Sequence, residues 1–597
     1  MEEELHPSKR LSSLLIAEQT MQRFLADGAA FSTPASRRSA NYQPSLWDDS
    51  YIQSLPDGSL DATQVDLWEN LKEEIRHLID YDKQNDIVEL LEIVDALCQL
   101  GISYHFESEI KNVLSFLASS SRSLSNIIKN NLHCSALLFR LLREYNIKVP
   151  NLSKDFLVRR FKNESGGFNI NIMNDVKGML SLYEASYLAV EGEDDLDAAM
   201  EFTTKHLSNY LKEPLLINPL LVEQISHALE LPSHWRMSRL HTRWFIDAYE
   251  RQENMNPNLL EFAKLDFNIV QTIYKKELKE LSMWWRSIGF VGDDFSFARD
   301  RLMETYLWSV GCTFEPRFWR CRKEITKLGC LITTIDDIYD VYGSLEELVF
   351  FTNAVDEWKI PESQQVSTCM KTTLLALFYT VNDIACTIST EKGIDILPHL
   401  KQVWGDLCKS YLVEAIWYYT GHIPMINEYM QNAWLTISAP LLLTSAYCLS
   451  EDLTIEALNS LELYIDVTFY SSMVSRLYDD LGTSTDELQR GDVPKSIQCY
   501  MNETKFSESV ARDHIRHLIK KYWKLLNAEY ISNFNLEDSF KRYALNLPRM
   551  SQCMYQHGDG YGKPICETRD RIISLLIKPI PLGIRDHDML SSTSYLI

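Results

Sequence analysis

Apolar side chains recur at intervals of three and four residues along most of this chain. Examples are the series Trp68, Leu71, Ile75 and Leu78 and the stretches Ile87 to Leu100 and Ile110 to Leu117. This spacing gathers the apolar residues on one stripe of an α-helix. Alternation of apolar and polar residues, which is typical of strands, is rare. The pattern predicts an all-α protein whose helices each bury one face.

The composition agrees with a helical fold and excludes several other classes of protein. The 597 residues include 21 glycines and 19 prolines, fewer than collagen-like, disordered or turn-rich β architectures need. The net charge of −24 disfavours binding to nucleic acid or to an anionic membrane. The 12 cysteines include no CxxC pair, so no zinc site follows, and no apolar window is long enough to span a membrane. We expect neither nucleic acid nor a membrane among the partners.

Changes in composition divide the chain into three parts. Residues 1–36 are rich in Ser and Ala, as in organelle transit peptides, but they open with Glu2, Glu3 and Glu4, which such peptides avoid. A polar run that includes Asn256-Pro257 then precedes a fresh apolar run. The sequence predicts a leader over 1–36, which is a candidate transit peptide, and helical domains over 37–255 and 256–597.

The sharpest local feature is the segment Asp336-Asp337-Ile338-Tyr339-Asp340, which follows an apolar run. A helix places Asp336 and Asp340 one turn apart on the same face. Two carboxylates so close repel each other unless a cation lies between them, and oxygen ligands suit Mg²⁺ or Mn²⁺. A solvated acidic helix end would show the same pattern, so the segment alone leaves both interpretations open.

A second acidic cluster runs from Asp479 to Glu487. Asp479, Thr483 and Glu487 are four residues apart and span about 80° of a helix face, which would align two carboxylates and a hydroxyl for a second metal site. A capped surface helix uses the same residue types. Cationic residues lie near both clusters, and these are Arg299, Arg301, Arg476 and Lys495.

Carboxylates that hold divalent metals, together with Arg and Lys, are what a departing diphosphate needs. The chain has no glycine-rich phosphate loop of the GxxxxGK[ST] type, which makes an ordinary nucleotide hydrolase a poor fit. Its second half is also rich in aromatic residues, among them Trp308 and Tyr555. Such residues are commonly plain core, but aromatic faces also stabilise a carbocation without offering a nucleophile.

These motifs together resemble the plant terpene synthase family. The resemblance runs from about Arg37 to Leu582, and the order and spacing of the motifs make it specific. It rests on the two acidic clusters and on Arg299-Asp300-Arg301, Arg490-Gly-Asp-Val-Pro-Lys, Tyr555-Gln-His-Gly-Asp-Gly, and Arg37-Arg38 followed by eight residues and Trp47. The paired arginines resemble the angiosperm monoterpene synthase subfamily most, and this resemblance implies a part for Arg38 in isomerising geranyl diphosphate before cyclisation.

The resemblance implies a class I terpenoid synthase fold, with an N-terminal α-barrel-like domain and a C-terminal catalytic domain that binds three Mg²⁺ or Mn²⁺ ions. For the metals, it implies that Asp336 and Asp340 ligate two ions with support from Asp337, and that Asp479, Thr483 and Glu487 hold the third. For the diphosphate, it implies binding by Arg299, Arg301 and Arg476 with help from Lys495. For the cavity, it implies that Trp308 lines it, that Tyr555 and Asp559 help to close it, and that Arg37, Arg38 and Trp47 form a strap or lid over it.

On this resemblance we expect a lyase that ionises a prenyl diphosphate, geranyl diphosphate above all, to monoterpene products and diphosphate. A sesquiterpene synthase acting on farnesyl diphosphate and a non-catalytic helical scaffold are the alternatives. We expect a monomer in the chloroplast or another plastid. The acidic leader leaves the cytoplasm as the alternative location.

Overall fold

The computed structural model of the protein describes residues 37, 40–58, 62–80, 86–119, 131–147, 162, 168–212, 218–290, 293–361, 365–532, 537–563 and 565–582. Over these ranges the chain contains helices and no β-strand, with one isolated bridge between Lys162 and Phe168. The predicted all-α fold is therefore confirmed. The predicted leader and Arg38 lie outside the described residues.

Several helices before residue 256 bury one apolar stripe, as their periodicity predicts. In α4, Asp86 caps the N-terminus by accepting from the backbone N–H of Val88, and Leu90, Val94 and Leu97 are buried. The helices of this part are α2 (Asp49–Ser54), α3 (Ala62–Leu78), α4 (Ile87–Gln99), α5 (Glu107–Ser119), α7 (Leu132–Glu144), α8 (Val176–Ser186), α9 (Asp194–Tyr210), α10 (Pro219–Glu230) and α11 (Ser238–Tyr249).

The helices after residue 256 are longer and enclose the larger part of the core. They are α12 (Pro257–Ser287), α13 (Leu302–Cys312), α14 (Trp319–Asp337), α15 (Leu345–Asp356), α16 (Thr368–Lys392), α17 (Leu397–Thr420), α18 (Ile426–Thr436), α19 (Ala439–Cys448), α20 (Ile455–Asn459), α21 (Ile465–Arg490), α22 (Ser496–Thr504), α23 (Glu508–Ser532), α24 (Asp538–Tyr555) and α25 (Cys566–Ile572). Two π-helical turns, η9 (Ile338–Tyr342) and η11 (Ile573–Ile577), continue α14 and α25.

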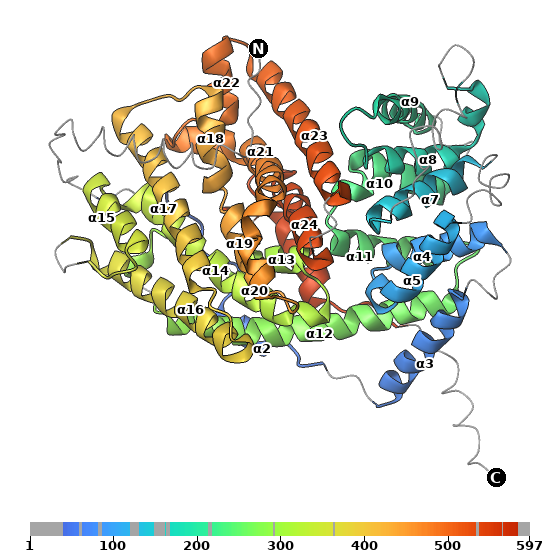
Figure 1. Cartoon of the computed structure of the whole chain (residues 1–597), viewed down its shortest axis with the longest axis horizontal. Helices are drawn as coiled ribbons and strands as arrows, with labels where there is room; N and C mark the ends of the chain where they lie inside the picture. Colours follow the sequence, from blue (N-terminus) through green and yellow to red (C-terminus); the bar gives the residue numbers. More distant parts are fainter. Residues whose placement is uncertain are drawn as a thin grey trace.

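Helix α12 runs across the lower part of the molecule, with most of the other helices above it and α3 below its right-hand end (Figure 1). It begins at Pro257, after the cap Asn256, where the sequence predicts a boundary. Helices α2 and α3 pack against it from the N-terminal side, and one continuous hydrophobic core includes residues from both sides of the boundary. The first helices are therefore part of the packing that supports the second group.

Helix α16 is long and apolar enough, by length and composition, to span a membrane. Half of its most apolar window is buried inside the protein, where the helix packs against α14, α15 and α17. The buried contacts account for part of its apolar composition, while Leu375 and Tyr379 on the same helix are exposed.

Candidate functional site

A cavity lies among α13, α14, α17, α19, α21 and α24. Its space amounts to about 1120 Å³, part of which is open to solvent. Two acidic walls, on α14 with η9 and on α21, face it at one end. The other end is apolar and includes Ile325, Ile332, Leu442 and Leu547. The cavity thus combines a charged end with an apolar end, which suits an amphiphilic ligand with an anionic head.

The first acidic wall lies where α14 changes into the π-helical turn η9. The backbone N–H of Gly343 donates to the carbonyl oxygen of Ile338 over 2.8 Å, and this wider bond ends the helix. Asp336 and Asp340 both line the cavity. Burial, followed by the negative charge of Asp336, raises the pKa of Asp340 well above its ordinary value of 3.8. The predicted pairing of the two carboxylates on one face is therefore present.

Asp337 points away from the cavity and is fully buried. Its Oδ2 accepts from the backbone N–H of Arg299 over 2.7 Å, and its Oδ1 lies 2.8 Å from the Arg299 guanidinium. Arg299 also donates to Asp336 Oδ2 over 2.6 Å. Asp337 therefore fixes the position of Arg299, and its carboxylate does not line the cavity as those of Asp336 and Asp340 do.

The second acidic wall lies on α21. Asp479, Thr483 and Glu487 all line the cavity. Arg476, one turn earlier, forms an ion pair with Asp479. Burial raises the pKa of Asp479 to about 7; the Arg476 guanidinium opposes this rise, and the nearby Glu487 adds to it. The three residues share one helix face, as their spacing predicts.

The close packing of α21 against α24 depends on one glycine. A Cβ at Gly482 would lie 2.8 Å from Cβ and from the carbonyl oxygen of Tyr555, so a side chain there would separate the two helices. The contact brings Tyr555 next to the acidic ridge of α21.

The oxygen donors of the two walls fit a divalent cation. Oε2 of Glu487 is buried and makes no hydrogen bond to the described part of the chain, so it has capacity for a metal. Nowhere in the described ranges do three His, Cys, Asp or Glu side chains meet closely enough to enclose an ion alone. Oxygens of a bound ligand can complete the coordination of a cation that such carboxylates hold.

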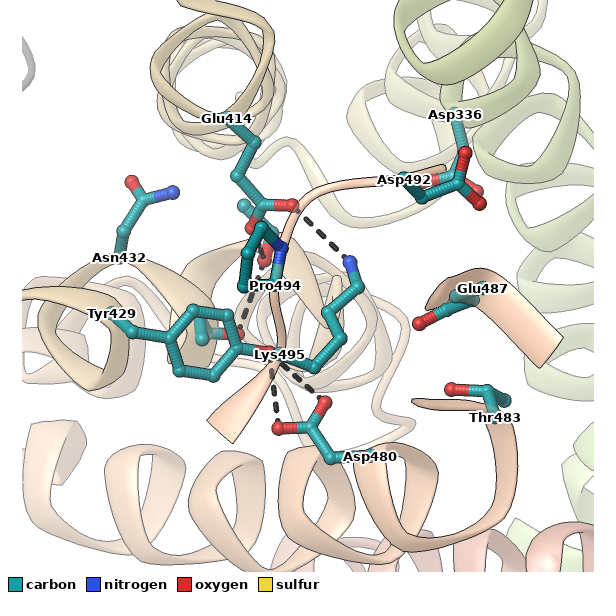
Figure 2. Close-up of polar contacts among 12 residues, drawn as sticks. Asp336, Glu414, Tyr429, Asn432, Asp480, Thr483, Glu487, Asp492, Pro494 and Lys495 are labelled. Atoms are coloured by element: carbon teal, nitrogen blue, oxygen red, sulfur yellow. Dashed lines mark hydrogen bonds and ion pairs between the residues drawn. The ribbon is translucent and has the colours of Figure 1, made fainter. Parts of the chain in front are cut away.

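Lys495 reaches the charged end from the cap of α22. Its ammonium lies 3.4 Å from Glu414 Oε2 on α17, and Figure 2 shows it between Glu414 and Glu487. The preceding turn begins with Gly491, whose φ of +80° ends α21 in the left-handed conformation that favours glycine. Asp480 fixes this turn, because its carboxylate accepts from the Tyr429 hydroxyl and from the backbone N–H of Ser496.

Arg301 differs from the other cations that the resemblance assigns to the diphosphate. Arg299, Arg476 and Lys495 line the cavity, whereas Arg301 does not. Its side chain is buried and donates to backbone carbonyl oxygens, including that of Gly562. Because these carbonyls occupy its donors, Arg301 is not presented to a ligand in the cavity.

Aromatic side chains contribute to the lining of the cavity. Trp308 on α13 makes edge-to-face contacts with Tyr555 and Tyr561, at centroid separations of 6.0 and 5.9 Å. Tyr411 on α17 also lines the cavity. Trp308, which the resemblance places in the lining, and Tyr555, which it places on the closing segment, both line the cavity, and their rings present polarisable surface.

The segment before α2 crosses the outside of the site. Arg37 donates to Glu347 Oε1 over 2.7 Å and to the carbonyl oxygen of Tyr342, so it binds both η9 and α15. The ring of Tyr42 lies against Arg299 at 5.0 Å and against Arg490 at 5.8 Å. Trp47 is buried in the core. The role predicted for Arg38 falls on a residue outside the described ranges.

Sequence reasoning gave no role to several residues that surround the site, namely Tyr42, Tyr411, Glu414, Thr436, Arg490 and Tyr561. Glu414 and Tyr411 are one turn apart on a largely buried helix. Burying polar groups is costly, so their presence in this apolar stretch could have indicated a functional role. The contact of Glu414 with Lys495 joins residues 81 positions apart, which no local pattern indicates.

Comparisons with known proteins agree with this geometry. Residues 46–229 match the family model for the terpene synthase N-terminal domain, and residues 289–525 match that for the terpene synthase metal binding domain. Terpene synthase 10 of Ricinus communis is 48% identical over 92% of this chain and 98% of its own length. Myrcene synthase, chloroplastic, of Quercus ilex is 46% identical over 94% of this chain and 93% of its own length.

Solved structures give the same result for the fold. Limonene synthase with 2-fluorolinalyl diphosphate superposes with a TM-score of 0.87 at 40% identity, over 92% of this chain and 100% of the other. Isoprene synthase from grey poplar, in complex with three Mg²⁺ ions and dimethylallyl-S-thiolodiphosphate, superposes with a TM-score of 0.81 at 38% identity, over 90% of this chain and 100% of the other. With both family models matched and these relatives covering nearly its whole length, the chain belongs to the terpene synthase family.

Proposed function

We propose that this chain ionises geranyl diphosphate and converts it to monoterpene products and inorganic diphosphate. The observation that carries the proposal is the cavity itself, with two acidic walls and buried cations at one end and apolar and aromatic side chains at the other. The names of the relatives support a ten-carbon substrate, since they include myrcene, α-terpineol and γ-terpinene synthases.

The cationic side chains bind and orient the diphosphate head. Arg299, Arg476 and Lys495 line the charged end, and each is held by a carboxylate, so little side-chain entropy is lost on binding. Asp336, Asp340, Asp479, Thr483 and Glu487 would hold Mg²⁺ or Mn²⁺, which would supply further positive charge toward the leaving group. The isoprene synthase complex with three Mg²⁺ ions supports a count of three.

Ionisation breaks the carbon–oxygen bond, and the electron pair leaves with the diphosphate oxygen. The resulting allylic cation lies in the apolar end, where the faces of Trp308 and Tyr555 stabilise its charge. Exclusion of water by the cavity walls keeps the cation from being captured early. Loss of a proton, or capture by one admitted water, ends the reaction.

Product analysis by gas chromatography tests the proposal. The full chain is incubated with Mg²⁺ and, in parallel, with geranyl or farnesyl diphosphate. Ten-carbon products are the expected result. Fifteen-carbon products alone would establish the sesquiterpene synthase alternative, and no product from either substrate would favour the helical scaffold.

We further propose domains over 37–255 and 256–597, a monomeric chain and a plastid location. The start of α12 at Pro257 supports the boundary, and relatives described as chloroplastic support the location. A fusion of residues 1–36 to a fluorescent protein tests the plastid location, and diffuse cytoplasmic fluorescence would contradict it. Sedimentation equilibrium tests the monomer, and a dimer mass would contradict it.

A further inference from the structure

Arg301 is a buried guanidinium whose donors are taken by backbone carbonyl oxygens. Its Nε donates to Tyr561 over 3.1 Å, its Nη1 to Asp300 over 2.8 Å, and its Nη2 to Gln43 over 2.9 Å and to Gly562 over 2.8 Å. The side chain is 2% exposed. The carboxyl groups of Asp300 and Glu304 lie close enough to interact with its charge, but its hydrogen bonds in the described part of the chain go to backbone carbonyl oxygens. Its charge is therefore used to join three chain segments.

Two of these segments cover the charged end of the cavity. We name residues 40–45 the strap and residues 559–562 the closing loop. In the strap, the ring of Tyr42 lies against Arg299 and Arg490, which both line the cavity. Gln43, the next residue, supplies the carbonyl that Arg301 binds. The strap is thus attached to Arg301 directly beside the ring that covers the two arginines.

The closing loop lines the cavity from the other side. The Tyr561 hydroxyl lies 2.8 Å from the Thr305 hydroxyl and 2.6 Å from that of Thr333, and its ring contacts Trp308. Asp559 accepts from the backbone N–H of Gly562 over 2.6 Å, which fixes the turn whose carbonyl Arg301 binds. One side chain therefore ties the strap to the loop.

We propose that Arg301 is a positioning residue that holds the strap and the closing loop together as one cover, and that this cover, with the Tyr42 ring, limits the entry of water into the cavity. The inference deepens the proposed function, on which it rests. Arg301 then controls whether the cation loses a proton or is captured by water, and it does not bind the diphosphate.

Arg301→Lys separates this role from binding of the diphosphate. Lysine keeps the positive charge, but its single ammonium cannot reproduce the planar fork that bridges Gln43, Tyr561 and Gly562. We expect the ratio of alcohol to hydrocarbon products to rise about tenfold, which is the effect of losing one to two hydrogen bonds from the closed cover. Arg299→Lys, at the cavity wall, is expected to slow diphosphate release with less change in this ratio. A fall in kcat/KM in Arg301→Lys with an unchanged ratio would overturn the proposal.

A second measurement does not depend on turnover. Amide hydrogen exchange is followed in the full chain with Mg²⁺ and inorganic diphosphate as the probe. We expect the strap and the closing loop to exchange faster together in Arg301→Lys. Arg251→Lys is the matched control, because Arg251 pairs with Glu223 at an exposed position in the first part of the chain, and no change is expected there. Unchanged exchange in both segments of Arg301→Lys would overturn the proposal, whether or not the protein turns over geranyl diphosphate.

Tyr42→Ala tests the strap through a residue that is not deeply buried. Removing the ring should raise the alcohol fraction, while Tyr42→Phe, which keeps the ring over Arg299 and Arg490, should not. Equal product ratios in Tyr42→Ala and the unaltered chain would contradict the role of the strap. If neither geranyl nor farnesyl diphosphate gives product, the proposed function fails, and the exchange measurement still decides the role of Arg301.

Discussion

Replacing Glu414 by Gln removes the charge that accompanies Lys495 inside the protein. The Lys495 ammonium lies 3.4 Å from Glu414 Oε2, and both side chains are buried. At an effective dielectric constant of about 20, unit charges at that separation attract by about 5 kcal/mol. Removing one partner of a buried ion pair destabilises proteins by about 3–5 kcal/mol, because the other charge stays buried. Because Gln can still accept from the Thr436 hydroxyl, we expect a loss near the lower end, about 3 kcal/mol.

The same substitution changes the protonation of Lys495. Burial alone would lower the pKa of this ammonium, but the carboxylates of Glu414 and Glu487 outweigh burial and hold the pKa well above 10.5. A raised pKa stabilises the folded chain below the pKa of the unfolded state, and this contribution is lost as the pH rises through the folded pKa. Without Glu414 the pKa of Lys495 falls, so the cation, and binding of the diphosphate with it, is lost at a lower pH.

Two assays measure these effects. Urea unfolding followed by circular dichroism gives the free energy of unfolding. Initial rates of diphosphate release, measured from neutral to alkaline pH, give the pH at which activity falls on the alkaline side (the alkaline limb of the pH profile). Glu428→Gln is the control, because Glu428 pairs with His422 at the surface and should cost about 0.5 kcal/mol or less. A loss of stability in Glu414→Gln no larger than in this control, with an unshifted alkaline limb, would refute the reasoning.

Four shorter predictions concern the metals, the cavity and Arg38. Asp340→Ala should abolish diphosphate release while the far-ultraviolet circular dichroism stays native, and full retention of activity would refute the metal assignment. Chelation by EDTA should stop diphosphate release, and added Mg²⁺ or Mn²⁺ should restore it; activity that persists in EDTA would contradict a metal requirement. Trp308→Leu removes a ring that contacts both Tyr555 and Tyr561, so chromatography should show a changed proportion of cyclic products, whereas an unchanged profile would remove Trp308 from the cation's surroundings. Arg38→Ala should lower kcat/KM for geranyl diphosphate and spare a pre-isomerised substrate, and equal loss on both would count against its predicted role.

Features of the fold that depend on local spacing could be predicted from the sequence. The apolar series from Ile87 to Leu100 corresponds to α4 (Ile87–Gln99), and the series from Ile110 to Leu117 lies within α5 (Glu107–Ser119). The cap Asn256 and the following Pro257 indicate the start of α12, because both residue types have positional preferences at a helix N-terminus.

From local spacing alone, the candidate site could be predicted only where its residues share a helix. Asp479, Thr483 and Glu487 form a ridge because four residues are little more than one turn. The direction of the Arg301 side chain could not be predicted, since it is set by carbonyls of residues 43, 561 and 562. Tyr42 reaches Arg490 from the opposite end of the chain, and only tertiary packing brings them together.

The attachment of Arg37 to η9 and α15 constrains how the protein can be shortened or fused. Arg37 binds the Tyr342 carbonyl and Glu347, directly after the first acidic wall. Any processing event or engineered truncation that removes residue 37 also removes this clamp, and one that passes residue 43 removes the strap contact with Arg301. An affinity tag joined directly before residue 37 would sit at the rim of the cavity. A useful N-terminal boundary for production of the protein therefore lies upstream of Arg37, with enough intervening residues to keep foreign sequence away from the site.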